Sequence, residues 1–193
     1  VCVGIESTTH SPLGVYADQP ETTNPRLYKG NSENLPNAYM PMGLTAERVA
    51  DEQGVSREDM DRYAVQSHTR AVAAQKSGHF ANEIIPVALP GGRTADSDDG
   101  PRAETTMESL AGLRAVFRRD GKVTAGNSCP LNDGAAAVVV MSDTKAAQLG
   151  ITPLARIVST GVSALEPELM GLGPIDSSKQ APARAGMTID DVD

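Results

Sequence analysis

Residues 122–141 read Lys-Val-Thr-Ala-Gly-Asn-Ser-Cys-Pro-Leu-Asn-Asp-Gly-Ala-Ala-Ala-Val-Val-Val-Met. The second part, residues 135–141, is a continuous apolar run, which is typical of a β-strand that is covered on both faces. Before it stand Gly126 and Gly134, where the missing side chain permits a close approach to the main chain. Polar side chains that can satisfy turn amides are Asn127, Asn132 and Asp133. The stretch therefore predicts a tight loop that enters a buried strand.

This glycine loop, residues 124–134, admits two interpretations. It can present main-chain donors and acceptors to an extended ligand, or it can be a tight structural turn that binds nothing. The residues of the loop alone leave both interpretations open.

The chain that follows the strand carries the signals of an α/β sheet. Residues 142–149 predict a helix that stops at Gly150, residues 154–159 predict a strand, and residues 178–185 predict a last helix that contains Pro182. A strand, a helix and a strand in this order indicate a sheet with a crossover connection.

Two helices are predicted before the loop. Thr45 is expected to cap a helix that runs through residue 52 and ends near Gly54. Ser56 opens the second helix with an acidic residue three positions later, as in a capping box, and Gly78 ends it.

Shorter elements are predicted between and before these helices. Residues 1–5 and 83–89 have the β-branched and apolar composition of strands, and the first of them is expected to be buried. Thr105 and Glu108 form a Thr-x-x-Glu capping box, which predicts a short helix over 106–113. Prolines argue against regular structure over residues 9–41: Pro12, Pro20, Pro25, Pro36 and Pro41.

Composition excludes several classes of protein. The chain has 193 residues, enough for one domain or parts of two, and its 39% apolar and 22% charged residues are typical of a globular protein. A formal net charge of −8 provides no overall positive field for nucleic acid. The two cysteines lie far apart, so we expect a reducing, cytoplasmic environment, and no apolar run approaches the ~20 residues of a membrane helix. The start at Val1, inside an apolar run, reads as a cut end.

The quoted stretch resembles the segment of thiolases whose core is Thr-Ala-Gly-Asn followed by Asn-Asp-Gly-Ala-Ala. Thiolases are coenzyme A-dependent enzymes that make or cleave carbon–carbon bonds by acyl transfer. Further segments agree with the family in order and spacing: Gly-Ile-Glu-Ser at 4–7, Met-Gly-Leu-Thr-Ala-Glu at 42–47, Gly-His-Phe with Glu-Ile-Ile-Pro-Val over 78–87, and Met-Gly-Leu-Gly-Pro at 170–174. The resemblance covers almost the whole chain.

The resemblance implies an α/β protein with a partial thiolase-like layered α-β-α-β-α fold and an inserted loop domain. Residues 1–8 would end the N-terminal thiolase half, and residues 9–124 would form a loop excursion that carries the coenzyme A contacts. Residues 125–150 would complete the N-terminal half, and residues 151–193 would begin the C-terminal half.

The resemblance also implies a set of coenzyme A contacts. Arg102 matches the arginine beside the adenosine end, where a guanidinium suits phosphate and ring stacking. Cys129 departs from the serine that is more common in the family, and a thiol donates a weaker hydrogen bond. The further matches are Ser109, Leu110, Phe117, Ala125, Leu131 and Met42, with Met170 in the acyl pocket.

Each contact has a structural alternative. Arg102 can be a solvated surface residue, Phe117 can belong to the core, and Met42 can serve packing. The arginines at 114, 118 and 119 can attract nucleotide phosphates or can simply be solvated. The histidines show no metal spacing, and no catalytic or metal-binding residue is assigned.

The implied reaction is thiolytic cleavage of a 3-ketoacyl-CoA to acetyl-CoA and a shortened acyl-CoA, as in β-oxidation of fatty acids. Coenzyme A and acyl-CoA would be substrates rather than tightly bound cofactors, and the complete protein would be a homodimer or homotetramer. The family's nucleophilic cysteine and its Asn-Glu-Ala-Phe, Gly-His-Pro and Cys-x-Gly motifs do not occur in these residues, so the chain as given is expected to be inactive. Alternatives are a biosynthetic acetyl-CoA acetyltransferase and a non-catalytic coenzyme A-binding or scaffold protein.

Overall fold

The computed structural model describes residues 1–8, 24–27 and 37–192. Much of the segment that was expected to be irregular, with Pro12, Pro20 and Pro36, lies outside the described residues; Pro25 begins the short 3-10 helix η2, Pro25–Leu27. The chain divides into two compact units. One comprises Val1–Thr45 and Leu131–Asp193, and the other comprises Ala46–Pro130.

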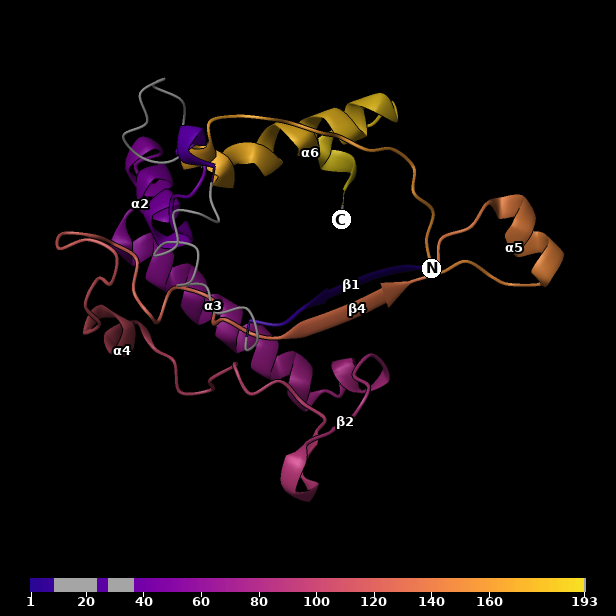
Figure 1. The fold of residues 1–193 in the computed structure, drawn as a ribbon, viewed down its shortest axis with the longest axis horizontal. Helices are drawn as coiled ribbons and strands as arrows, with labels where there is room; N and C mark the ends of the chain where they lie inside the picture. The colour runs from indigo at the N-terminus through magenta and orange to yellow at the C-terminus, as the bar shows by residue number, and fades with distance from the viewer. Residues whose placement is uncertain (9–23, 28–36, 193) are drawn as a thin grey trace. The chain divides into compact units, whose positions relative to one another are not determined.

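The first unit contains one pair of strands. Strand β1, Cys2–Glu6, runs antiparallel to β4, Gly134–Val138, with Ile5 opposite Ala135 (Figure 1). Both predicted strands are therefore confirmed, although β4 ends three residues before the apolar run does. The expectation that they are buried is wrong for the described chain, because every residue of both strands is exposed, with Ile5 75% exposed. Two strands alone offer no second layer to cover either face.

The helices of this unit follow their end signals. Helix α5, Asp143–Leu149, begins after Ser142, whose hydroxyl accepts a hydrogen bond from the Lys145 amide at 3.1 Å, and it ends at Gly150 with φ of 65°. Helix α6, Gly173–Arg184, contains the predicted Pro182 but starts five residues earlier than expected. Its early start is explained by a proline in its first turn, which is pre-set for helical φ.

The strand predicted over 154–159 is wrong, since these described residues form no strand. Two hydrogen bonds join the end of this segment to α6 instead: the Ser159 hydroxyl donates to the Ala181 carbonyl, and the Arg184 side chain donates to the main-chain carbonyl of Thr160 at 2.6 Å. The 3-10 helices η5, Pro167–Leu172, and η6, Ile189–Asp191, flank α6 in the chain.

The second unit is built on two successive helices. Helix α2, Met42–Glu52, enters it from the first unit, and helix α3, Arg57–Lys76, follows a turn in which Gly54 has φ of 65°. Ser56 caps α3 as predicted, with its hydroxyl accepting from the Asp59 amide at 3.0 Å. The expected cap at Thr45 is wrong: this residue lies inside α2 and its hydroxyl donates to the Met42 carbonyl at 2.7 Å.

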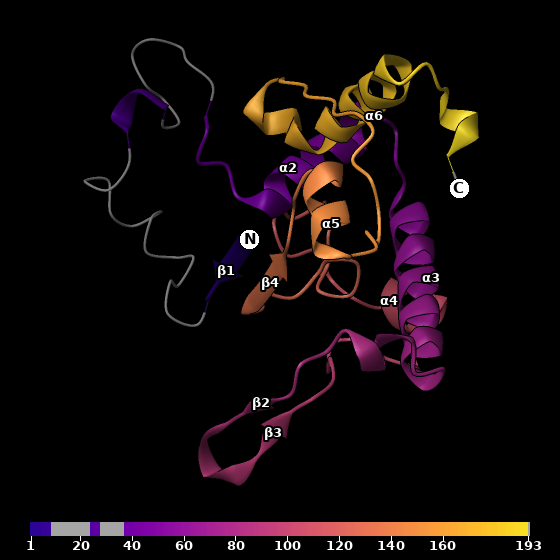
Figure 2. The same ribbon diagram turned by 90° about the vertical axis from the view of Figure 1, so that its right-hand side faces the viewer.

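The rest of the second unit is short elements. After η3, His79–Asn82, strands β2, Val87–Ala88, and β3, Thr94–Ala95, form a small hairpin around the turn η4, Pro90–Gly92 (Figure 2). The strand predicted over 83–89 is thus only two residues long. Helix α4, Met107–Ala111, is confirmed but shorter than predicted.

The capping box of α4 is shifted by one residue from the prediction. Thr106 is the N-cap, and its hydroxyl accepts from the Ser109 amide at 3.2 Å. The sequence pattern favoured Thr105 because Glu108 stands three positions later, whereas Thr106 is followed at that distance by Ser109, which completes the box in place of a glutamate.

The buried residues of the second unit are unusually polar. Its buried apolar residues are Ala50, Leu110 and Val123. Its buried polar residues are Glu47, Asp61 and Thr124. Within the part of the chain that the structure describes, no helix combines the length and the apolar character that crossing a membrane requires.

Candidate functional site

Glu47 fixes the chain that leads into the glycine loop. It lies on α2 and is 1% exposed, and its Oε1 accepts hydrogen bonds from the main-chain amides of Lys122 at 2.7 Å and Val123 at 2.8 Å. Arg118 lies 3.2 Å from its second oxygen. Gly121 is required beside this carboxylate, because an added Cβ would run into it. Glu47 therefore holds both sides of the 118–123 turn.

The same turn is clamped to the end of α2. The Lys122 ammonium donates to the carbonyls of Val55 at 2.8 Å and Ala50 at 3.3 Å, which places a positive charge at a helix C-terminus. Arg118 makes two hydrogen bonds to Asp51, at 2.7 and 3.0 Å. This guanidinium lowers the pKa of the Asp51 carboxyl to about 2, and the carboxylate in turn raises the pKa of Arg118.

These contacts change the role of the basic cluster. The charge of Arg118 is compensated by Asp51 and Glu47, so it serves the turn itself. The two interpretations of the cluster, phosphate attraction and plain solvation, then concern Arg114 and Arg119, which are exposed.

The start of the glycine loop is closed by its own side chains. Thr124 is completely buried, and its hydroxyl accepts from the amides of Gly126 at 3.2 Å and Asn127 at 3.3 Å. The contact is reciprocal, because Oδ1 of Asn127 accepts from the Thr124 amide at 2.8 Å. Three amides of the loop are thus satisfied internally, as the interpretation of a structural turn requires. A ligand would meet the main chain of Ala125 or of residues after Asn127.

The two glycines of the loop behave differently. A Cβ on Gly126 would lie 2.5 Å from a methyl group of Leu110 and 2.5 Å from one of Leu113. The predicted close approach is therefore confirmed at Gly126, where the end of α4 makes it. At Gly134 no described atom lies within 4 Å of a Cβ position, so the close approach expected there stays a prediction.

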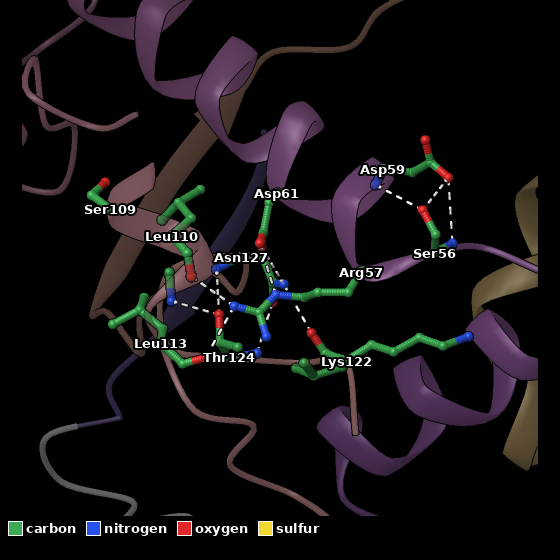
Figure 3. Close-up of polar contacts among 12 residues, drawn as sticks. Ser56, Arg57, Asp59, Asp61, Ser109, Leu110, Leu113, Lys122, Thr124 and Asn127 are labelled. Carbon is green, nitrogen blue, oxygen red and sulfur yellow. Dashed lines mark hydrogen bonds and ion pairs between the residues drawn. The ribbon is translucent and has the colours of Figure 1, made fainter. Parts of the chain in front are cut away.

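Asp61 links the loop to α3. It is 2% exposed, and its two oxygens accept from the Asn127 side-chain amide at 2.9 Å and from Nε of Arg57 at 2.8 Å (Figure 3). The Asn127 amide also donates to the Lys122 carbonyl at 3.0 Å. The orientation of this amide is fixed, because a flip would turn its oxygen toward the Asp61 carboxylate.

Arg57 extends the link to α4. Its Nη2 donates to the carbonyls of Leu110 at 2.6 Å and Leu113 at 3.0 Å, at the C-terminal end of the helix (Figure 3). The Leu110 carbonyl also accepts from the Leu113 amide at 3.0 Å, so the guanidinium adds a second donor to it, and it bonds to the Leu113 carbonyl two residues after α4 ends. Arg57 therefore contacts both the carboxylate that holds the loop and the helix that packs against it.

Six of the nine predicted contact residues belong to the second unit. In that unit Leu110 is buried, Phe117 is 43% exposed, and the others are exposed. The predicted contacts in this unit are Arg102, Ser109, Leu110, Phe117, Ala125 and Cys129. The first unit holds the remaining three, all of them exposed: Met42 at the start of α2, Leu131 in the last part of the glycine loop, and Met170 in η5.

Two of these residues have structural tasks as well. The Ser109 hydroxyl accepts from the Thr106 amide at 3.0 Å and donates to its carbonyl at 2.9 Å, within the cap of α4. The Arg102 amide donates to Nδ1 of His68 at 3.1 Å, which ties the preceding loop to α3 and leaves the guanidinium exposed.

Sequence reasoning missed the residues that hold the site. Glu47, Arg57 and Asp61 were not singled out, because charged residues on helices are usually solvated. A signal existed for the last two: they are oppositely charged, one helical turn apart. Nothing in the local pattern of α2 distinguishes Glu47 from the other acidic residues of that helix.

The comparisons with known proteins agree with one another. The family model "Thiolase, N-terminal domain" matches residues 1–144. An acetyl-CoA acetyltransferase of Chromobacterium violaceum is 46% identical over 161 residues, covering 81% of this chain and 41% of its own length. A 3-ketoacyl-CoA thiolase of Enterobacter sp. strain 638 is 42% identical, covering 100% of this chain and 50% of its own length.

Solved structures show the same likeness. Human mitochondrial 3-ketoacyl-CoA thiolase, in a crystal structure in complex with CoA, has a TM-score of 0.76 and 41% sequence identity, covering 80% of this chain and 39% of that chain. The expected partial thiolase-like α/β fold is thereby confirmed. The chain spans 50% or less of the length of each of these relatives.

Proposed function

This chain belongs to the thiolase family, and from that premise we propose that the protein is a thiolase-type acyltransferase in which residues 102–131 contribute to the coenzyme A surface. The observation that carries the proposal is the braced start of the glycine loop. Buried Glu47, Asp61 and Thr124 hold its main chain through hydrogen bonds within the protein. A surface that is rigid before binding loses less conformational entropy when a flexible ligand such as coenzyme A settles on it.

The exposed residues have side chains that suit different parts of the coenzyme A molecule. The Arg102 guanidinium can pair with phosphate and stack on adenine, and Phe117 offers an exposed aromatic face. Ala125 and Cys129 belong to the loop that would lie along the pantetheine arm. Coenzyme A enters the reaction as a substrate in this proposal, and no group in the chain is assigned to bond making or breaking.

We propose thiolytic cleavage as the direction: a 3-ketoacyl-CoA and coenzyme A give acetyl-CoA and an acyl-CoA shortened by two carbons. Support comes from the alignment with the Enterobacter 3-ketoacyl-CoA thiolase, which covers the whole chain. Residues 41–43 and 105–108 also resemble that branch. Acetyl transfer between two acetyl-CoA molecules is the second candidate, favoured by the higher identity to the Chromobacterium acetyltransferase.

The test uses the complete gene product that carries these residues. Release of acetyl-CoA is followed with coenzyme A and either acetoacetyl-CoA or a longer 3-ketoacyl-CoA. A higher kcat/KM for the longer substrate supports cleavage, and activity confined to acetoacetyl-CoA supports the second candidate. Binding of coenzyme A without turnover would identify a non-catalytic binding protein, and absence of both would refute the proposal.

Arg102→Ala tests where the nucleotide end of coenzyme A binds. The variant should raise KM for coenzyme A thioesters and leave turnover of a short N-acetylcysteamine thioester unchanged, because that substrate lacks the nucleotide. Arg93→Ala, at an exposed arginine of the β2–β3 hairpin, is the matched control and should change neither value.

The 193-residue chain made by itself is expected to be inactive, since the family's nucleophile and downstream motifs are not among its residues. Acetyl-CoA released by that purified polypeptide would contradict this. For the complete protein we propose a cytoplasmic homodimer or homotetramer acting in fatty acid β-oxidation, and sedimentation analysis distinguishes the two assemblies.

A further inference from the structure

The first turn of α3 joins two segments that are distant in sequence. Arg57 bonds to the end of α4 through the Leu110 and Leu113 carbonyls, and Asp61 bonds to Asn127 in the glycine loop. Arg57 and Asp61 bond to each other at 2.8 Å. A continuous chain of hydrogen bonds therefore runs from α4 to the loop through one ion pair (Figure 3).

The burial of this pair makes its geometry strict. The Asp61 side chain is 3% exposed and that of Arg57 is 26% exposed, so water cannot replace a lost partner at the carboxylate. Both oxygens of Asp61 are engaged by charged or amide donors. The planar guanidinium presents Nε to the carboxylate and Nη2 to the carbonyls in a fixed relation, which a lysine cannot reproduce.

Apolar packing against Gly126 also restricts where the glycine loop can lie. The side chains of Leu110 and Leu113 fill the space that a Cβ on Gly126 would need. The end of α4 is thus held by its carbonyls on Arg57 and by its side chains on the loop. A shift of either segment would break a part-buried hydrogen bond or open a gap beside Gly126.

We propose that Arg57 and Asp61 are positioning residues for coenzyme A: they set where the glycine loop stands relative to α4, and neither touches the ligand. The inference rests on the proposed function, in which residues of both segments, Ser109 and Ala125 among them, contact coenzyme A. If the Arg57–Asp61 pair is broken, the loop and the end of α4 are less ordered in the free protein. Coenzyme A must then order them when it binds, and this entropy cost lowers its affinity.

The experiment measures the dissociation constant of coenzyme A and the steady-state kinetics of the complete gene product. In Asp61→Asn, the new amide group faces a hydrogen-bond donor, either Arg57 or the Asn127 amide, and the negative charge that pairs with Arg57 is lost. Its dissociation constant and KM for coenzyme A should rise about tenfold or more, with kcat changed less than about threefold, because uniform binding is lost.

Further variants keep the test decisive if Asp61→Asn does not fold. Arg57→Lys retains the charge but loses the planar guanidinium, and should give an intermediate increase in the dissociation constant. Asn127→Asp sets two carboxylates against each other and should also raise it. Asp61→Asn combined with Asn127→Asp restores a donor and an acceptor between the two positions in reversed order, and should bind coenzyme A more tightly than Asn127→Asp alone. Such a recovery measures direct coupling between the two positions.

Control variants separate positioning from general stability. Ser56→Ala removes the cap of the same helix, and Arg62→Ala removes an exposed arginine that pairs with Glu58 and Asp59. Both should leave the affinity for coenzyme A within about twofold, although Ser56→Ala lowers the melting temperature.

The outcomes distinguish this inference from the proposed function. Wild-type protein that neither binds coenzyme A nor turns over a thioester overturns both. Wild-type protein that binds, together with Asp61→Asn and Arg57→Lys variants that bind equally well at a lower melting temperature, overturns the positioning role alone and leaves the pair a purely structural link.

Discussion

Gly126→Ala tests how tightly the glycine loop is packed on α4. The new Cβ would lie 2.5 Å from methyl groups of Leu110 and Leu113, and each must withdraw by about 0.9 Å to reach the 3.4 Å at which ordinary contact begins. Leu110 is 4% exposed and its carbonyl is held by Arg57, so it has little freedom to withdraw.

The magnitude follows from two opposing effects. Overpacking of a buried site costs about 1–3 kcal/mol, whereas replacing glycine stiffens the unfolded chain and returns about 0.4–1 kcal/mol. The net loss in the free energy of unfolding should be on the order of 1–2 kcal/mol. Gly100→Ala is the matched control in the same unit, because no atom lies within 4 Å of its Cβ position. It should be neutral or stabilising by up to about 1 kcal/mol.

The assay is urea unfolding of the complete gene product, with hydrogen exchange of peptides spanning residues 106–127 to locate the change. Gly126→Ala should speed exchange there, and Gly100→Ala should not. A second substitution, Leu113→Ala, makes room beside the new methyl group and should recover part of the loss, since Leu113 is itself 39% exposed. The reasoning is refuted if Gly126→Ala is as stable as Gly100→Ala, or if Leu113→Ala makes it still less stable.

Three further predictions concern the polar contacts. Glu47→Gln should lower the free energy of unfolding by about 1–3 kcal/mol in urea titrations, because the amide group turns a donor toward main-chain amides or Arg118; an unchanged midpoint would argue against it. The pKa of Asp51 is lowered from 3.8 to about 2 in the folded protein, so the stabilisation by this carboxylate is present above pH 4 and is lost as the pH falls toward 2. Asp51→Asn should therefore destabilise the protein at pH 7, and its difference in stability from wild type should disappear between pH 4 and pH 2 in acid titrations followed by circular dichroism. A difference that stays constant with pH would contradict this. Thr106→Ala should cost about 1 kcal/mol in thermal unfolding and Thr105→Ala less than about 0.5 kcal/mol, whereas the reverse order would restore the capping register expected from sequence.

The sequence predicted the parts of the fold that short-range signals determine. Ser56 with its capping box and the left-handed residues Gly54, Gly78 and Gly150 set helix ends correctly, because each signal acts within one turn of the chain. The strand over 154–159 could not be judged in this way, since a strand exists only if a partner lies beside it.

In the candidate site, too, the sequence predicted the features that depend on nearby residues and missed those that depend on distant ones. The resemblance pointed to the glycine loop, and the loop's own turn chemistry, with Asn127 satisfying an amide, followed from its residues. Glu47 was missed because its main-chain partners lie more than seventy positions away. The bond between Asp61 and the loop also spans more than sixty positions, and only its ion pair with Arg57 is local. A carboxylate that is destined for burial has no local mark that separates it from one that stays in water.

The polar interior of the second unit has a thermal consequence. Exposing apolar surface raises the heat capacity of a protein, and exposing polar surface lowers it. A unit whose largest fully buried side chains are Glu47, Thr124 and Asp61 should therefore unfold with a smaller heat-capacity increment than its length suggests. Its free energy of unfolding should therefore change little with temperature, and the glycine loop should stay folded over a wide range of temperatures.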